Sequence, residues 1–328
     1  MTNTENKPII ETIGLKKYFD VGNKKKLHAV DDVNMKIYKG QTLGVVGESG
    51  CGKSTLGRTL MKLLEPTEGT ILFEGQDITK LNPKEMRKFR RDMQMIFQDP
   101  YSSLNPRQTI SDAIAMPLKI HKMCSSSAEL EKRTKELMDT VGIAQRLVNA
   151  YPHELDGGRR QRVCVARALA CNPKFIVCDE PVSALDVSIQ AQILNLLMDI
   201  QDEMGLTYMF ITHDMSVVKH ISDEIMVMYM GKCVEKAPYN ELFARPTHPY
   251  TKALLSAIPV PDITMRMKKA KVIRGEVTSP VDPKPGCRFA VRCDHCSEIC
   301  TKQDLPLNEI APNHFIACPY AEEAFKKA

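Results

Sequence analysis

The stretch GESGCGKST, residues 47–55, constrains the possible folds of this chain more than any other part of the sequence. It fits the phosphate-binding pattern G-x-x-x-x-G-K-[S/T], with its glycines, lysine and serine at the defining positions. The apolar residues 42–47 before it predict a buried strand, and leucines at helical spacing in residues 55–64 predict a helix after it. Strand, glycine-rich loop and helix in this order predict an α/β fold with an anion-binding loop.

The residue types in this loop suit the binding of a nucleoside triphosphate. Backbone N–H groups and the helix N-terminus converge on an anion, and the glycines let the backbone approach phosphate closely. Lys53 can neutralise terminal phosphate oxygens, and the Ser54 hydroxyl can bind Mg²⁺. A chain of 328 residues matches the pattern by chance only about once in a hundred. The residues expected to contact the nucleotide here are Gly47, Glu48, Ser49, Gly50, Cys51, Gly52, Lys53, Ser54 and Thr55.

The length and composition fit a globular chain of about two domains. The formal charge of +5 is mild and spread along the chain, which gives no reason to expect nucleic acid as a partner. No apolar run approaches the length of a membrane span, and the N-terminal residues MTNTENKPII are polar. We therefore expect a cytoplasmic chain that docks on a membrane protein.

Two further apolar runs end in residues that can act on a bound nucleotide. The first, residues 175–178, is followed by Asp179 and Glu180 at the expected carboxyl end of a strand. Asp179 can hold Mg²⁺ through water, while Glu180 can orient and deprotonate an attacking water. The second run, residues 208–212, leads into His213. By itself, His213 is as well explained by a structural hydrogen bond as by a contact with the γ-phosphate.

Five of the eleven cysteines lie between residues 287 and 318. Because a cytosolic chain keeps its thiols reduced, this grouping favours a metal site over disulfides. Only Cys293 and Cys296 form the C-x-x-C pair of which zinc sites usually have two. Thiolates in a tight run followed by a distant one suit an iron–sulfur cluster at least as well. Prolines from Pro259 and Pro261 onward predict a linker into this small appendage.

Taken together, the motifs resemble those of the ATP-binding subunit of an ABC transporter, in the oligopeptide/dipeptide importer branch. The resemblance runs nearly end to end, through MIFQDP (the Q-loop), FIVCDEP (Walker B) and the HPY motif of the importers' C-terminal extension. LDGGRRQR stands where the family has LSGGQ. Phe19 falls where an aromatic ring stacks on adenine, with Tyr18 the second choice. The other matching residues are Gln98, Asp156, Gly157, Gly158, the D-loop Asp186 and the switch histidine His213.

The resemblance implies an α/β P-loop NTPase core with an inserted α-helical subdomain and a small Cys-rich C-terminal extension. The ABC ATPase domain would span residues 1–258, its helical subdomain residues 99–165, and the extension residues 259–328. In the subdomain, Ser126 and Glu129 fit a capping box that starts a helix running to Gly142. The segment from Tyr101 to Pro106 would receive the membrane subunit.

The resemblance also implies a mechanism that needs two ATPase domains. They would close head to tail around two ATP molecules at the cytoplasmic face of the membrane, and hydrolysis would drive peptide import. The implied partners are a second, different ATPase subunit, two permease subunits and, indirectly, an extracellular substrate-binding protein. Glu180, His213 and Gln98 would be catalytic, and Ser54, Gln98 and Asp179 would surround Mg²⁺. Cys287, Cys293, Cys300 and Cys318 would hold a 4Fe-4S cluster, with Cys296 as an extra thiol and zinc as the alternative.

The sequence departs from the family pattern at Asp156 and Arg159, which replace the serine and glutamine of LSGGQ. The family's serine donates a hydrogen bond to the γ-phosphate bound by the partner, whereas a carboxylate only accepts. Two unit charges about 4 Å apart repel by about 4 kcal/mol at an effective dielectric near 20. We therefore expect a heterodimer with one impaired site. The alternative is a tolerated variant, with Arg159 offsetting the charge or Asp156 pointing away.

The same residues bear on three other functions. A soluble ABC ATPase of translation or DNA repair would have two cassettes or a long heptad insertion, and this chain has neither. A mainly regulatory ATP-binding subunit is at odds with the intact Glu180 and His213. An importer of nickel or another small solute in the same branch remains an alternative, since the ATPase does not touch the solute.

Overall fold

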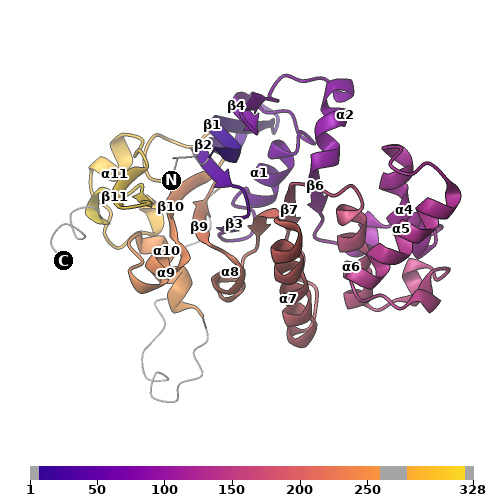
Figure 1. The fold of residues 1–328 in the computed structure, drawn as a ribbon. Coiled ribbons are helices and arrows are strands. Elements are labelled where there is room, and N and C mark those ends of the chain that lie inside the picture. Colours follow the sequence, from indigo (N-terminus) through magenta and orange to yellow (C-terminus); the bar gives the residue numbers. More distant parts are fainter. Residues whose placement is uncertain (1–6, 259–278, 322–328) are drawn as a thin grey trace, which may run out of the picture.

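The predicted strand, loop and helix lie at the centre of the computed structural model, which describes residues 7–258 and 279–321 (Figure 1). The predicted linker residues Pro259 and Pro261 lie outside the described residues. Strand β3 pairs in parallel with β9 on one side and β8 on the other, and β7 and β6 continue the parallel order. These elements are β3 (Thr42–Val46), α1 (Lys53–Leu60), β6 (Met93–Ile96), β7 (Phe175–Asp179), β8 (Thr207–Ile211) and β9 (Glu224–Tyr229).

All five residues of β3, β7 and β8 are buried, as a strand covered on both faces requires. The three apolar runs of the sequence are thus confirmed as central strands, and the predicted α/β P-loop core is confirmed with them. Parallel order places the carboxyl ends of these strands at one edge of the sheet. The phosphate loop, Glu180 and His213 follow those ends, and Asp179 is the last residue of β7.

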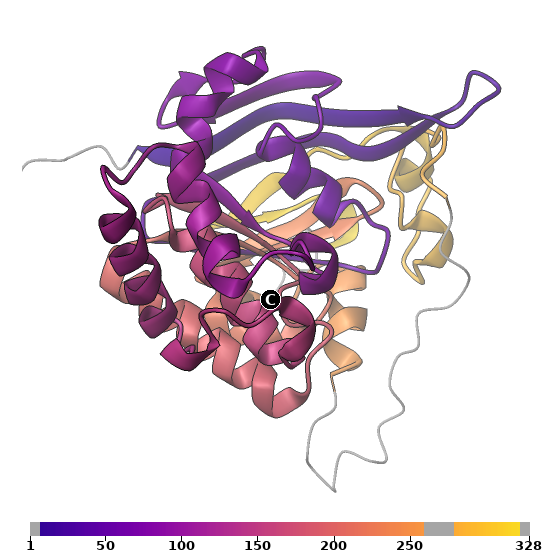
Figure 2. The same cartoon turned by 90° about the vertical axis from the view of Figure 1, so that its right-hand side faces the viewer.

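A second sheet, which is antiparallel, covers the side of α1 that faces away from β3 (Figure 2). The sequence pattern did not predict it. Its strand order is β2-β1-β4-β5. Apolar side chains of β1, β2, α1 and β3 form one continuous core cluster, so α1 lies between the two sheets. The four strands are β1 (Pro8–Asp20), β2 (Lys26–Tyr38), β4 (Glu68–Phe73) and β5 (Gln76–Asp77); helix α2 (Pro83–Asp92) then leads into β6.

The predicted helical subdomain forms a group of helices beside β6 and β7 (Figure 1). Ser126 Oγ accepts a hydrogen bond from Glu129 N, as the capping-box pattern predicts, but Glu129 Oε2 accepts from Ser125 N instead of Ser126 N. Gly142 follows the helix with φ of +68°. Helix α6 continues past residue 165 and packs into the same core as the sheet. The helices are α3 (Pro100–Ser103), α4 (Ile110–Ile120), α5 (Ser127–Thr140) and α6 (Gly157–Leu169).

The remaining described elements of the ATPase domain are one strand, β10, which pairs with β9 in the main sheet, and four helices. None of the described helices is long and apolar enough to span a bilayer. The elements are α7 (Val187–Met204), α8 (Met215–Ile221), β10 (Lys232–Pro238), α9 (Tyr239–Ala244) and α10 (Pro249–Ser256).

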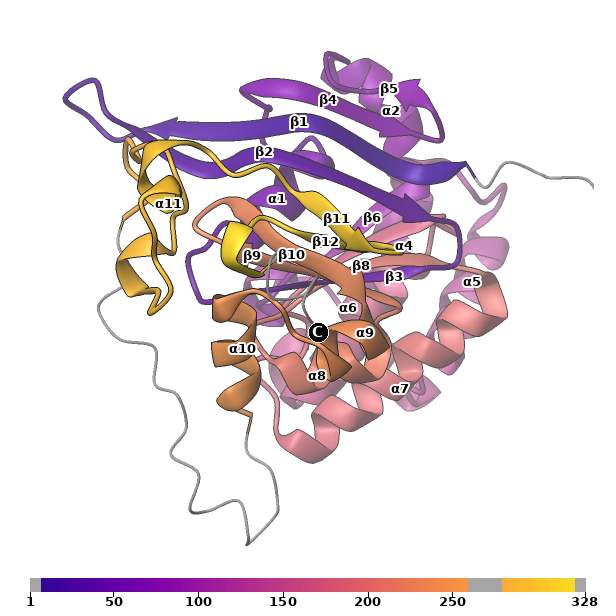
Figure 3. The same cartoon turned by 90° about the vertical axis from the view of Figure 1, so that its left-hand side faces the viewer.

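The C-terminal extension joins both sheets (Figure 3). Strand β12 pairs antiparallel with β10, so the extension lengthens the main sheet to eight strands. Upstream, Val281 bridges Leu27 of β2, and His28 N donates to Pro280 O at 2.9 Å. The described part of the extension is therefore built into the ATPase domain. Its elements are a 3₁₀ turn (Ala290–Arg292), α11 (Ile299–Lys302), β11 (Asn308–Ala311) and β12 (His314–Ile316).

A buried carboxylate, that of Glu235, connects the extension to the main sheet. Glu235 of β10 is fully buried and accepts hydrogen bonds from Thr247 N at 2.8 Å, His248 N at 2.9 Å and His314 Nε2 at 2.9 Å. His314 lies on β12, so a single side chain ties the extension to the sheet and to the start of α10. Three donors satisfy most of the acceptor capacity of a buried carboxylate.

Candidate functional site

The phosphate loop has a backbone that only glycine adopts without strain at two key positions. Gly50 and Gly52 have φ of +76° and +104°. A Cβ at Gly52 would lie 1.9 Å from Ala29 O, and one at Gly47 would lie 2.2 Å from Met228 O. The loop is therefore held against β2 and β9 at its two ends, which explains why the motif needs glycine there.

A pocket of about 840 Å³ opens along this loop. All nine loop residues from 47 to 55 line it, and its wall is completed by residues of β1, β2 and α10, by Pro280 and by the segments after β6, β7, β8 and β9. Of the predicted nucleotide contacts, Asp156, Gly157, Gly158, Asp179 and Asp186 do not line it. Beyond the loop, the pocket is lined by Phe19, Leu27, Ala29, Gln98, Glu180, Ser183, Ala184, His213, Gly231, Leu254 and Pro280.

The two β1 aromatics proposed for adenine differ in position. Phe19 lines the pocket, whereas Tyr18 does not. Tyr18 stacks on His28 with 3.8 Å between ring centroids and donates to Asp31 Oδ1 at 2.5 Å. Successive side chains of a strand point to opposite faces, so only one of the two can face the nucleotide. The geometry favours Phe19.

Ser54 and Asp179 together offer oxygen ligands of the kind that Mg²⁺ prefers. Ser54 Oγ donates to Asp179 Oδ1 at 2.5 Å, and Arg58 Nη2 lies 3.7 Å from Asp179 Oδ2. Asp179 is fully buried, and burial raises the pKa of its carboxyl group. Within the described ranges its Oδ2 has no hydrogen-bond partner. A buried carboxylate and a hydroxyl at the loop fit a divalent cation, which would compensate this charge.

Glu180 is the point where two other predicted residues meet. Gln98 Nε2 donates to Glu180 Oε2 at 2.9 Å, and His213 Nδ1 lies 3.4 Å from the same oxygen. Glu180 has φ of +46°, an unusual value for a residue other than glycine. Its backbone N donates to Ile211 O at 2.9 Å, which fixes it against β8. Gln98 therefore contacts the general-base candidate in this structure, not the Ser54–Asp179 pair.

Lys53 is buried at the mouth of the loop. Its Nζ donates to Gly47 O at 2.8 Å and to Glu48 O at 3.0 Å. The ammonium is therefore held beside the loop whose N–H groups are expected to bind phosphate. The positive charge of Lys53 thus lies next to the phosphate loop, as the motif predicts.

Asp156 is the N-cap of helix α6 and does not line this pocket. Its Oδ1 accepts from Arg159 N at 2.7 Å as an N-cap, and Arg159 Nε lies 3.4 Å from its Oδ2. Gly158 packs so closely that an added Cβ would lie 2.7 Å from Ile189 Cγ2. Asp186 precedes α7 and makes no side-chain cap bond. None of these residues lines the pocket at the chain's own phosphate loop.

The four predicted cluster ligands gather in the extension. Burial raises the pKa of the Cys287 thiol to about 12, and the nearby Cys318, Cys300 and Cys293 thiols add to the effect. Cys296 is exposed. No three His, Cys, Asp or Glu side chains of residues 7–258 and 279–321 lie at metal-binding distance. Thiolates are the ligands of iron–sulfur and zinc centres, so the chemistry of the four cysteines suits such a centre, and the cluster stays a prediction.

Two residues that no motif assigned to the nucleotide site contact the phosphate loop, namely Tyr250 of α10 and Arg292 of the extension. Tyr250 OH accepts a hydrogen bond from Glu48 N at 2.8 Å, and the Arg292 guanidinium pairs with the Glu48 side chain. The HPY motif signalled Tyr250 by resemblance only. Glu48 and Arg292 are 244 positions apart in the sequence, and no sequence pattern predicted that they pair.

Comparison with known proteins identifies the family of the chain. The family described as "ABC transporter" matches residues 30–183, and "Oligopeptide/dipeptide transporter, C-terminal region" matches residues 234–300. The putative oligopeptide transport ATP-binding protein YkfD of Bacillus subtilis (strain 168) is 49% identical over 95% of this chain and 95% of its own length. The oligopeptide transport ATP-binding protein OppF of Escherichia coli (strain K12) is 47% identical over 95% of this chain and 96% of its own.

Solved structures give the same result for the fold. The dimeric ATP-binding cassette MJ0796, bound to ADP and Pi, superposes with a TM-score of 0.65 at 31% identity, over 70% of this chain and 98% of that one. cbiO1 from Clostridium perfringens superposes with a TM-score of 0.65 at 29% identity, over 73% and 92%. The chain therefore belongs to the ATPases of ABC transporters, in the family of oligopeptide transport ATP-binding proteins.

Proposed function

We propose that this chain hydrolyses ATP to power the import of oligopeptides or dipeptides, as the nucleotide-binding subunit of an ABC transporter. The observation that carries the proposal is the meeting of Gln98 and His213 on the Glu180 carboxylate, at the edge of a pocket lined by the whole phosphate loop. The chain would lie at the cytoplasmic face of the membrane, against two permease subunits and, indirectly, an extracellular substrate-binding protein.

Each residue has a separate task in the proposed hydrolysis. Lys53 and the loop N–H groups hold the β- and γ-phosphates, and Phe19 stacks on the base. Glu180 takes the proton of the attacking water, while Gln98 and His213 orient the Glu180 carboxylate and the water. Ser54 and Asp179 would hold Mg²⁺, which neutralises charge on the phosphate oxygens when bound.

The Glu180→Gln variant tests the proposed base. It should bind Mg²⁺-ATP and lose hydrolysis by at least about a hundredfold, since general-base catalysis contributes about 10²–10⁴-fold. Glu203→Gln, on the exposed face of α7, is the matched control and should hydrolyse ATP like the wild type. In cells lacking the native chain, wild type and the control should restore uptake of a labelled short peptide. Uptake restored by Glu180→Gln would refute the proposal.

The second ATPase subunit is part of the proposal. The chain's own site has all its elements, whereas Asp156 puts a carboxylate on the surface that would complete the partner's site. Its N-cap bond and its ion pair with Arg159 support the tolerated-variant alternative equally well. We favour a heterodimer in which the partner's site is weakened, with Asp186 and Gly157–Gly158 on the same interface.

Two measurements separate these readings. Light scattering after size exclusion shows whether Glu180→Gln forms homodimers with Mg²⁺-ATP alone, which would mean that Asp156 permits closure. A monomer that dimerises only with a related ATPase subunit supports the heterodimer. Asp156→Ser, which keeps an N-cap oxygen, should raise turnover of the assembled pair. An unchanged rate would remove the case for a weakened site.

We also propose that Cys287, Cys293, Cys300 and Cys318 hold a 4Fe-4S cluster with a structural or redox-sensing role. The gathering of four thiols in the extension supports it, and zinc is the competing metal. Anaerobically purified protein should contain iron and absorb broadly in the visible range. Cys287→Ser should lose both, and Cys296→Ser should keep both. Protein with zinc instead of iron, or with neither, would refute the cluster.

A further inference from the structure

The loop residue Glu48 is held by the C-terminal extension and by the HPY motif at the same time. Arg292 Nη1 and Nη2 lie 2.7 Å and 3.2 Å from the two Glu48 carboxylate oxygens, which is a bidentate pair. The Arg292 side chain is only 6% exposed, and that of Glu48 is 24% exposed. On the other side of the same residue, Glu48 N donates to the buried Tyr250 OH.

A cluster of packed aromatic rings supports the Arg292–Glu48 pair. The rings of Tyr229, Tyr250 and Phe289 pack edge to face or tilted, with centroids between 4.7 Å and 5.3 Å apart. Arg292 also donates to Tyr229 OH at 3.2 Å. The guanidinium is thus positioned before it reaches the loop, so little side-chain entropy is lost in making the contact.

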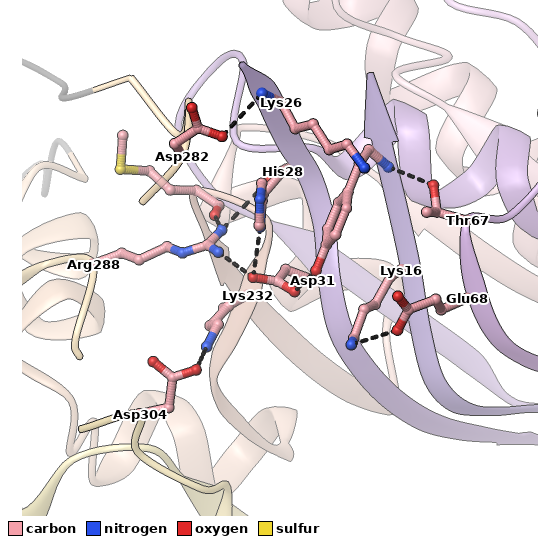
Figure 4. Close-up of polar contacts among 12 residues, drawn as sticks. Lys16, Lys26, His28, Asp31, Thr67, Glu68, Lys232, Asp282, Arg288 and Asp304 are labelled. Carbon is pink, nitrogen blue, oxygen red and sulfur yellow. Dashed lines mark hydrogen bonds and ion pairs between the residues drawn. The ribbon is translucent and has the colours of Figure 1, made fainter. Parts of the chain in front are cut away.

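A second arginine, four residues earlier, fixes the extension to β2 (Figure 4). Arg288 forms an ion pair with Asp31 of β2, and its guanidinium donates to Met230 O. Burial pushes the pKa of Asp31 upward, but the Tyr18 hydrogen bond and the Arg288 charge outweigh it and lower the pKa. Nearby, Lys232 Nζ pairs with Asp304 of the extension at 2.8 Å.

From these contacts we infer that Arg292 and Tyr250 are positioning residues of the nucleotide site, which hold the phosphate loop through Glu48 and thereby set its affinity for triphosphate. The inference rests on the proposed function, because it requires that the loop binds nucleotide. A loop already held in its binding conformation loses less entropy when the ligand arrives. Arg288 and Arg292 are the chain neighbours of Cys287 and Cys293, so the cysteine segment and the phosphate loop are mechanically linked.

Equilibrium binding of Mg²⁺ with ATP, and of Mg²⁺ with inorganic triphosphate, tests the inference on the full chain. Arg292→Ala should raise the Kd for both ligands by the same factor, about tenfold, which corresponds to about 1.4 kcal/mol. Arg292→Lys keeps the charge without the fork and should fall between wild type and Arg292→Ala. Lys302→Ala, which removes an exposed ion pair of the same extension, is the matched control and should change neither Kd.

A double-mutant cycle shows whether Arg292 acts through Glu48. If it does, Glu48→Gln combined with Arg292→Ala binds no more weakly than Arg292→Ala alone. Additive losses would overturn the inference. At saturating ATP, kcat of Arg292→Ala should match wild type while KM rises, since Glu180, Gln98 and His213 lie on other segments. A lower kcat with unchanged KM would also overturn it.

The two possible failures are distinguishable. A wild-type chain that binds neither ATP nor triphosphate refutes the proposed function itself. A wild-type chain that binds both, with Arg292→Ala equal to it, refutes only the inference. Should Arg292→Ala not fold by circular dichroism, Arg292→Lys and Tyr250→Phe carry the test, because both preserve most of the packing.

Discussion

The buried His248 is expected to make folding of this chain sensitive to mild acid. Its side chain is 1% exposed, Nδ1 accepts from Tyr250 N at 3.1 Å, and in the described part of the chain Nε2 has no hydrogen-bond partner. Burial lowers the pKa of His248 to about 4; the nearby Glu235 carboxylate opposes the shift and the Lys252 charge adds to it. The folded state therefore favours the neutral imidazole, whereas the unfolded chain protonates it near the ordinary pKa of about 6.5.

The direction and size of the pH effect on the free energy of unfolding follow from this difference in pKa. Below about pH 6.5 the unfolded state binds the extra proton, so the free energy of unfolding falls as the pH falls, and the loss levels off below the folded pKa. A difference of about 2.5 units is worth about 3 kcal/mol in total. Between about pH 7.5 and about pH 4.5, the loss from this one group should be about 2.5 kcal/mol.

Urea unfolding of wild type and His248→Gln at the two pH values measures the effect. The glutamine oxygen can still accept the Tyr250 N–H but does not titrate. The stability advantage of wild type should therefore shrink by about 2.5 kcal/mol at the lower pH, because other groups titrate equally in both proteins. His220→Gln, at an exposed position of α8, is the control and should leave the pH dependence as in wild type. Parallel curves for wild type and His248→Gln would refute the reasoning.

Three further changes have expected results. Gly44→Ala places a Cβ 2.4 Å from Ser222 Oγ and should cost about 1–3 kcal/mol by overpacking; thermal unfolding with an unchanged midpoint would contradict this. Phe19→Ala should weaken ATP binding by about tenfold, since base stacking is worth about 1–3 kcal/mol, and leave inorganic triphosphate binding unchanged. Glu235→Ala leaves its buried donors unpaired and should cost about 3–5 kcal/mol in denaturant titrations. A loss below about 1 kcal/mol would show that its bond with His314 contributes little.

Local pattern predicted the elements that carry chemistry. The glycine loop and the three central strands were found because each has a short, contiguous signal. The antiparallel sheet of β1, β2, β4 and β5 was missed, although β1 and β2 are each 13 residues long. Their register contains several bulges, which interrupt the alternation that reveals a half-buried strand.

By itself the sequence determined the phosphate loop, the Asp179–Glu180 pair, His213 and the order of the motifs, because contiguous residues encode these features. Only the tertiary structure decided that Phe19 and not Tyr18 faces the pocket, and that Gln98 and His213 meet on one carboxylate. It also decided that Arg292 reaches Glu48 across 244 positions. Such contacts depend on how separate elements pack, and the free energy of packing comes from surfaces that no single segment contains.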